Sequence, residues 1–242
     1  MDIAASPLLL GAVLAIVFAA AIVQAGLGMG FGLTAAPLLA LLDPELVPAP
    51  TLFLGFATAT WGALSERNAI RWDEVGVAAL GRFTGVVAAT FVLAALTDRG
   101  TFMLLFGIMI AVAVALSLAG WRMGFTRFRL AAMGTLSGVM GTITSVGAPP
   151  LAIVYQDRPS AEARPTLAAF FAIGCAVSLA GLYIAGWAGP REFGLALVMA
   201  PAMIAGTATA RLLRGRFDRR YRPAMLLASA VAALILIVRG LA

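Results

Sequence analysis

The sequence predicts an all-α polytopic membrane protein, with two inverted repeats and helices interrupted at glycine-rich breaks. Three observations predict this fold class. The 242-residue chain is 62% hydrophobic and 12% charged, with a mean hydropathy of +1.01. Apolar runs near the roughly 20 residues that cross a bilayer recur from end to end, and the second half of the chain repeats motifs of the first. We therefore expect one transmembrane domain over residues 1–242, with about eight to ten membrane segments.

Short loops that hold nearly all the charge separate the segments. Segments are expected near 7–25, 30–42, 47–65, 75–96, 101–120, 130–143, 147–156, 165–188, 192–210 and 223–241. The second, sixth and seventh segments are too short to span a bilayer alone. Each therefore thins the bilayer, crosses it together with a neighbouring segment or re-enters from one side. The first segment is preceded by Asp2 and by no Lys or Arg, which favours a membrane segment over a cleaved signal peptide.

The arginines predict the orientation of these segments. All 17 basic residues are Arg, and 13 of them fall in four loops, against three (Arg99, Arg191 and Arg239) on the opposite side of the membrane. The Arg-rich loops are 66–74, 121–129, 157–164 and 211–222. Because cytoplasmic loops collect Arg and Lys, these four are predicted inside and both termini outside the cytoplasm. The net charge of +6 thus reports topology, and we expect membrane lipids and no nucleic acid as partners. The loop at 211–222 could bind anionic lipid heads, but topology alone explains its arginines.

The two halves of the chain match at two offsets. A shift of 112 residues places Pro37 on Pro149. After a loop three residues longer, a shift of 115 places the "PTL" of 50–52 on the "PTL" of 165–167. Matches at nearly constant offset over separate motifs indicate an internal repeat.

The repeats run over about 5–120 and 128–242, and each holds five segments. An odd number of segments means that the second repeat enters the membrane upside down relative to the first. Inverted repeats of this kind are typical of secondary transporters, which hold substrate near the midplane between interrupted helices.

Two glycine-rich stretches interrupt the apolar pattern at equivalent places in the repeats. The first is "QAGLGMGFGLTAAPLL" at 24–39, and the second is "GTITSVGAPPLAIVYQ" at 141–156. Irregular backbone at membrane depth is tolerated only where it is buried in protein or lines a wet cavity. The free N–H groups at the start of a half-helix favour an anion. We expect the two breaks to meet near the midplane and share one anion site; the alternative is that these glycines serve close helix packing.

These two stretches resemble the paired signatures of the sulfite exporter TauE/SafE family. The similarity covers nearly the whole chain and includes "PTL" after each break and "GRFTG" at 81–85. It departs at Phe31, where the family commonly has a third consecutive glycine, and at Ala148, where "GGPP" is usual. The resemblance implies a multi-pass transporter of the bacterial inner membrane. It also implies a small anion as substrate, with sulfite and organosulfur compounds, such as sulfonates, as the known class.

Arg82 is the charged residue that lies deepest in a predicted segment. It is about 12 Å of helical rise into the run at 75–96. An arginine at such depth normally faces a partner or a wet cavity. No Asp or Glu falls inside a segment, so we expect backbone carbonyls or a bound anion as its partner. The alternative is that Arg82 snorkels or braces a helix end.

Hydroxyl and amide side chains beside the breaks complete the candidate substrate site. Hydroxyl groups can donate to an anion without carrying charge, or they can bond backbone carbonyls of their own helices. The amide of Gln24 can likewise face the site or join two helices. The candidate substrate-binding residues are Gln24, Gly28, Gly30, Gly32, Thr34, Arg82, Thr142, Thr144, Ser145 and Gly147.

The composition argues against an enzyme. The chain has no His, one Cys in an apolar run (Cys175) and no carboxylate inside a segment, so no catalytic site, metal or cofactor is expected. Alternating-access transport of sulfite or an organosulfur anion is the favoured function. The alternatives are transport of another small organic anion and a membrane assembly protein that does not transport. The expected partners are the anion and membrane lipids, with a homodimer as an option.

The topology gives the first testable prediction. In intact cells, cysteine introduced at 125 or 218 should be shielded from an impermeant thiol reagent, because these positions lie in loops predicted inside. Cysteine introduced at 99 or 191 should react. The reverse labelling pattern would overturn the predicted orientation.

Overall fold

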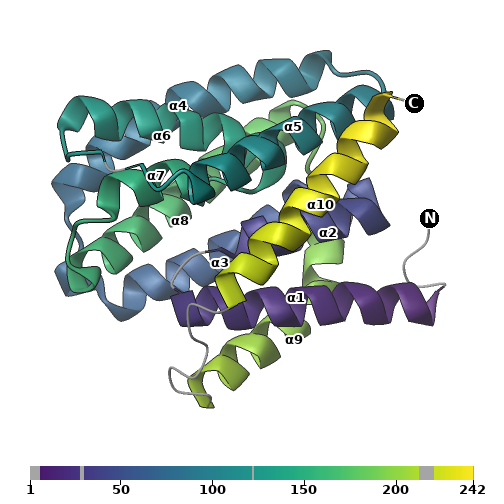
Figure 1. The fold of residues 1–242 in the computed structure, drawn as a ribbon, viewed down its shortest axis with the longest axis horizontal. Coiled ribbons are helices and arrows are strands. Elements are labelled where there is room, and N and C mark those ends of the chain that lie inside the picture. The colour runs from purple at the N-terminus through teal and green to yellow at the C-terminus, as the bar shows by residue number, and fades with distance from the viewer. Residues whose placement is uncertain (1–5, 28–29, 122, 213–220, 242) are drawn as a thin grey trace.

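The computed structural model is helical throughout the part of the chain that it describes, residues 6–27, 30–121, 123–212 and 221–241 (Figure 1). Ten α-helices follow one another in these ranges, with two short 3₁₀ turns, η2 (Pro44–Leu46) and η3 (Arg67–Ala69). The helices are α1 (Pro7–Leu27), α2 (Phe31–Leu42), α3 (Ala49–Ser65), α4 (Trp72–Ala95), α5 (Arg99–Leu118), α6 (Arg127–Thr144), α7 (Ala148–Tyr155), α8 (Ser160–Ile184), α9 (Pro190–Leu212) and α10 (Tyr221–Leu241).

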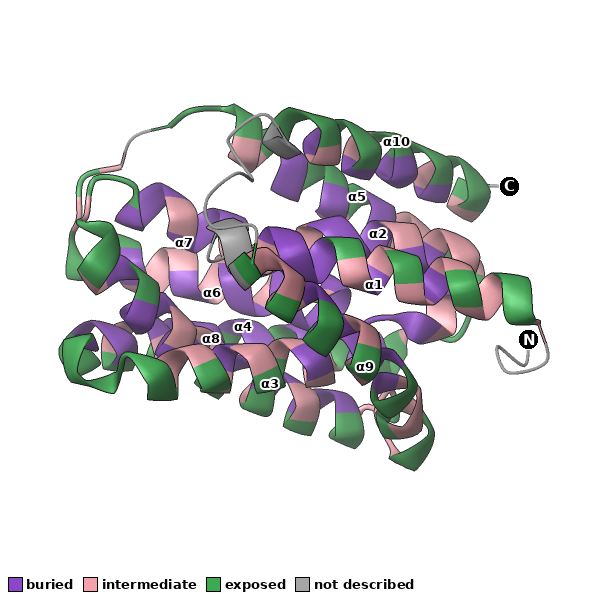
Figure 2. Cartoon of the chain, turned by 90° about the horizontal axis from the view of Figure 1, so that it is seen from below, coloured by how far each residue is buried: buried purple, intermediate pink, exposed green. Residues whose placement is uncertain are grey.

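Six of these helices are long and apolar enough to cross a membrane, namely α1, α4, α5, α8, α9 and α10. Helices α2 and α7 have 12 and eight residues, as their short apolar runs predicted. Large apolar side chains such as Leu80, Phe91 and Ile184 are exposed on the long helices. Figure 2 shows exposed residues on outward faces and buried residues toward the middle. This distribution is what a lipid-facing surface requires.

Each of the ten expected segments is a helix, but three helices, α4, α6 and α8, begin three or more residues earlier than predicted. Helix α6 starts at Arg127 because the hydroxyl of Thr126 accepts the N–H of Arg129 at 3.2 Å and caps the helix. Its 18 residues rise about 27 Å, so the sixth segment is longer than predicted, but it is not among the six helices that are long and apolar enough to cross a membrane. Helix α4 starts at Trp72 and takes two acidic residues into its first turn, where the helix dipole favours them.

Helix α8 begins at Ser160, although the sequence predicted a start at Pro165. Proline favours the first turn of a helix, which is why it marked the boundary. In the structure Pro165 lies one turn further in. The carbonyl that it leaves unbonded belongs to Ala161, which is exposed at the helix start.

The helices pack in pairs that cross between the two halves of the chain. Helix α4 packs on α6, α9 on α1, α3 on α8 and α5 on α10 (Figure 1). The half-helix α2 contacts α1 and α10, and α7 contacts α6 and α5. Every contact named here has a counterpart five helices further along the chain. An inverted repeat would produce this pairing.

Glycines allow the closest of these contacts, between α4 and α6. A methyl group at Gly81 would overlap the carbonyl oxygen of Ala131, and one at Gly85 would overlap that of Thr135. From the other side, Gly134 and Gly138 lie against the backbone of α4. Small residues on both helices therefore bring the two backbones into contact, as is common in membranes.

Two arginine contacts lie at the end of the molecule that holds the chain termini. The start of α1 and the end of α10 lie at this same end (Figures 1 and 2), as an even number of membrane crossings would place them. At that end Arg239 donates to the carbonyl oxygen of Leu41 at 3.2 Å, and Arg99 pairs with Asp43 at 3.1 Å. Which end faces the cytoplasm stays a prediction.

The α4–α6 contact predicts a sharp difference between two glycines of one helix. Gly81→Ala should destabilise the protein by about 1–3 kcal/mol, because the new methyl group has to displace backbone. Gly76→Ala is the matched control, since nothing lies within 4 Å of its added methyl group. Thermal unfolding of the purified protein measures both. Equal melting temperatures for the two variants would contradict the packing described.

Candidate functional site

The first glycine-rich stretch interrupts its helix, as predicted. Helix α1 ends at Leu27 and α2 begins at Phe31. Between them Gly30 has a φ of 120°, a backbone conformation that disfavours other residues. The side-chain oxygen of Gln24 accepts the N–H of Phe31 at 2.9 Å and fixes the start of α2. Gly28 lies outside the described residues.

The second stretch interrupts its helix between Thr144 and Ala148. Ser145 ends α6 in the left-handed conformation with a φ of 65°, and Gly147 precedes α7. The hydroxyl of Thr144 donates to the carbonyl of Met140 at 2.6 Å. Each break therefore separates two helical segments of the same repeat.

The two breaks contact each other directly. A methyl group at Gly32 would overlap the carbonyl oxygen of Ser145. The hydroxyl of Ser145 donates to the carbonyl of Pro48 at 2.8 Å and lies 2.6 Å from the hydroxyl of Thr51. The expectation that the breaks meet is thus confirmed, and Gly32 also has the packing role that was the alternative.

A cavity of about 660 Å³ lies against both breaks. Its inner end is lined by Gln24, Gly30, Gly32, Arg82, Ser145 and Gly147, and its walls by Thr51, Thr58, Trp61, Phe171, Cys175, Met203 and Thr207. The cavity extends to the exposed residues Glu66 and Arg164, which lie 3.6 Å apart at the end of α3 and the start of α8. It therefore reaches the surface at the end opposite the chain termini.

Arg82 is buried on the wall of this cavity, with 2% of its surface exposed. One terminal nitrogen donates to the hydroxyl of Ser137 at 2.9 Å, and the other to that of Ser178 at 3.4 Å. Nε has no hydrogen-bond partner among the described residues. The guanidinium lies 5.3 Å from the ring centre of Phe170 and 6.0 Å from that of Phe171. Every one of these partners is neutral.

Glycines make room for the guanidinium at the second break. A methyl group at Gly174 of α8 would overlap Nε of Arg82. Methyl groups at Gly141 and Gly147 would each lie 2.9 Å from a terminal nitrogen of Arg82. Ser137 links this cradle to the break, because its hydroxyl also donates to the carbonyl of Gly147 at 2.6 Å.

Six of the predicted site residues thus line one cavity, and three do not. Thr34 donates to the carbonyl of Gly30 at 2.9 Å, and Thr144 bonds its own helix in the same manner. Thr142 is fully buried and lies 2.9 Å from the hydroxyl of Ser178. For Thr34 and Thr144 the alternative role, bonding to the helix backbone, is the one found.

The two half-helices present different chemistry to the cavity. Gly32 and Leu33 line it at the start of α2, where their N–H groups have no acceptor within the helix. At the start of α7, Pro149 and Pro150 follow Ala148 and have no N–H at all. Of the first three residues of α7, only Ala148 has an N–H group, and it lines the cavity. The guanidinium of Arg82 lies beside the same break.

Sequence reasoning missed the residues that hold Arg82. Ser137 and Ser178 are two of several hydroxyl residues within largely apolar helices, and Gly174 is one of 26 glycines. A spacing signal was present, since Gly174 and Ser178 are four residues apart and share one face of α8. Nothing in the sequence aligns that face with Arg82.

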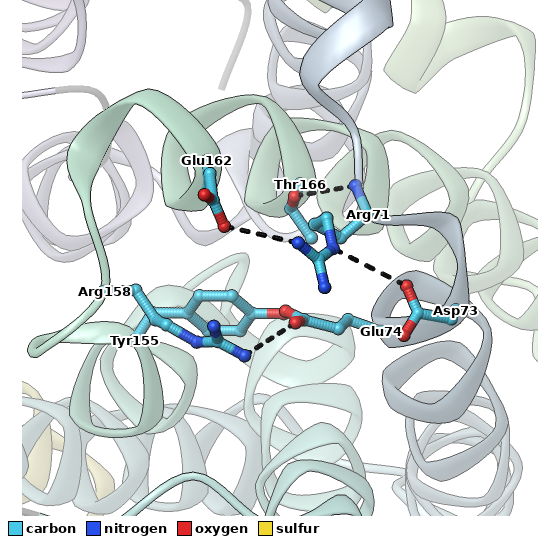
Figure 3. Close-up of polar contacts among 7 residues, drawn as sticks. All are labelled: Arg71, Asp73, Glu74, Tyr155, Arg158, Glu162 and Thr166. Atoms are coloured by element: carbon cyan, nitrogen blue, oxygen red, sulfur yellow. Dashed lines mark hydrogen bonds and ion pairs between the residues drawn. The ribbon is translucent and has the colours of Figure 1, made fainter.

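A second polar cluster lies at the end of the molecule where the cavity reaches the surface (Figure 3). Glu74, which is 6% exposed, accepts from the hydroxyl of Tyr155 and from Arg158, each at 2.8 Å. Arg71 lies between Asp73 at 3.9 Å and Glu162 at 3.6 Å. These contacts tie the first turn of α4 to the end of α7 and the start of α8.

The chemistry of the cavity suits binding of an anion. It offers a buried cation, exposed amide groups and apolar walls. In the described part of the chain, no three His, Cys, Asp or Glu side chains are grouped to hold a metal ion.

Comparison with protein families identifies the chain. A model of the family described as sulfite exporter TauE/SafE matches residues 13–236. The chain belongs to this family. Comparison with curated proteins and with solved structures gives no match.

Membership of the TauE/SafE family assigns the general function. Proteins of this family are membrane transporters and not enzymes, so the chain is a multi-pass membrane transporter of a small solute. The breaks and the cavity are therefore candidate parts of a transport site.

The cradle around Arg82 gives a prediction for a double variant. Gly174→Ala should destabilise the protein by about 1–3 kcal/mol, because the methyl group and the guanidinium cannot share the space. Combining it with Arg82→Gln, which shortens the side chain, should recover part of that loss in a double-mutant cycle. Thermal unfolding is the measurement, and Gly194→Ala, with nothing within 4 Å, is the control. Strictly additive effects would contradict the contact.

Proposed function

We propose that this transporter carries a small anion with a sulfite or sulfonate group, bound at Arg82 between the two breaks. The observation that carries the proposal is the buried guanidinium on the cavity wall, bonded to two neutral hydroxyls. Burying a charge costs several kcal/mol unless it is paired. A bound anion would supply the pairing.

The donors near Arg82 fit an oxyanion. A guanidinium has five N–H groups, and two hydrogen bonds from it are accounted for in the structure. The N–H groups of Gly32 and Leu33 add donors from the start of α2, where the helix dipole also favours negative charge. Three oxygens of a sulfite or sulfonate group would match this set.

The size of the cavity favours an organic anion over bare sulfite. A volume of about 660 Å³ lies within the range of sites for whole organic ligands. Its walls include apolar side chains such as Trp61, Phe171 and Met203. An organosulfonate would place its charged group at Arg82 and its carbon part along these walls. Organic carboxylates of similar size are the competing substrates.

We infer that transport proceeds by alternating access of two inverted repeats, about 5–120 and 128–242, around a site near the midplane. The pairing of each helix contact with one five helices later supports the repeat. Arg82 lies about 15 Å of rise into α4, near the middle of its 24 residues. The cavity extends to Glu66 and Arg164, in loops predicted cytoplasmic. This conformation would accordingly be inward-open.

Substitution of Arg82 tests the proposal. Arg82→Gln should weaken binding or uptake of methanesulfonate and sulfite by about tenfold or more, equivalent to about 1.4 kcal/mol for a lost charge-assisted contact. Uptake into proteoliposomes and equilibrium binding to the purified protein are the measurements. Arg71→Gln, which removes an exposed arginine outside the cavity, should leave both unchanged.

Two results would contradict the proposal. Wild-type rates in Arg82→Gln would make Arg82 a structural residue. A folded wild-type protein that moves none of the sulfur oxyanions would leave another small organic anion as the substrate.

A further inference from the structure

Among the described residues, the lining of the cavity carries one positive charge in excess. Its charged members are Arg82, Arg164 and Glu66. Glu66 and Arg164 lie 3.6 Å apart at the exposed end, so their charges offset each other. Arg82 is the charge that remains at the inner end.

The groups that face Arg82 do not change this balance. Helix α6 presents the hydroxyl of Ser137 and glycine backbone, and α8 presents the hydroxyl of Ser178, two aromatic rings and the thiol of Cys175. The acid nearest along α4, Glu74, is about 12 Å of helical rise away and is already bonded to Tyr155 and Arg158.

The hydroxyls next to Arg82 have few hydrogen bonds left to give. Ser137 donates its proton to the carbonyl of Gly147. The hydroxyl of Ser178 lies 2.9 Å from the hydroxyl of Thr142, so the proton of one of these two hydroxyls is used in the hydrogen bond between them. Among the described residues that line the cavity, a second negative charge on a ligand at Arg82 would find no second unpaired cation.

On the basis of the anion site assigned above to Arg82, we propose that the site selects its ligand by charge. It binds an oxyanion as the monoanion and discriminates against the dianion of the same shape. One guanidinium offsets one negative charge, whereas a second would be buried without compensation. Organic sulfonates and hydrogen sulfite fit this rule, while sulfate and fully ionised sulfite do not.

The rule has a consequence for proton movement. Hydrogen sulfite is sulfite plus one proton, so each ion carried as the monoanion brings its own proton across. The chain has no His, and Glu74, the buried acid of α4, is already bonded to Tyr155 and Arg158. Proton transfer would then accompany sulfite and be absent for a sulfonate, which has no proton to carry.

Binding to the purified full-length chain in lipid nanodiscs tests the proposal, with methanesulfonate, sulfate and sulfite as probes. Sulfate should bind about 100-fold or more weakly than methanesulfonate, and methanesulfonate affinity should not change with pH. Sulfite affinity should fall about tenfold per pH unit once the pH exceeds the pKa at which hydrogen sulfite ionises. Cys175→Ala should keep this profile, because the proton belongs to the ligand and not to the thiol.

The outcomes separate this inference from the proposed function. Sulfate bound as tightly as methanesulfonate, in a manner lost in Arg82→Gln, would overturn the charge rule and leave the anion site in place. A pH profile that disappears in Cys175→Ala would also overturn it, since the thiol would then be the titrating group. Absence of binding by all three anions would remove both proposals.

Discussion

The burial of a positive charge beside a broken helix is the constraint on which the rest of the site depends. Arg82 has its guanidinium in a cradle of glycine backbone and two hydroxyls. Taking such a group out of water is costly, so every surrounding element is shaped to accommodate it. Helix α6 ends beside the guanidinium, α8 carries glycine where a side chain would clash with it, and a cavity adjoins it.

The interrupted helices and their neighbours were predictable because they depend on local sequence. Apolar runs, prolines and glycines located ten helices to within five residues, and the two breaks were recognised from their glycines, the prolines that follow them and the internal repeat. The largest errors are at the two ends of α8, which begins at Ser160, before the predicted Pro165, and ends at Ile184, before the predicted residue 188. Local signals of this kind are weakest at helix ends.

The partners of Arg82 could not be predicted in this way. Ser137 and Ser178 are 55 and 96 residues away along the chain. Their approach depends on the rotation and crossing of α4, α6 and α8, which the apolar pattern leaves undetermined. Hydroxyls near the breaks looked equally suitable, yet Thr34 and Thr144 bond their own helices. The distance of a residue from a break along the sequence therefore did not predict whether its side chain lines the cavity.

Each half of the chain has a long helix that packs on a helix of the other half, and this affects which parts of the molecule can move together. Helix α4 belongs to the first half but packs on α6, and α9 belongs to the second half but packs on α1. The packing of each half is therefore completed by a helix of the other half, and the two halves are interlocked across the middle of the chain.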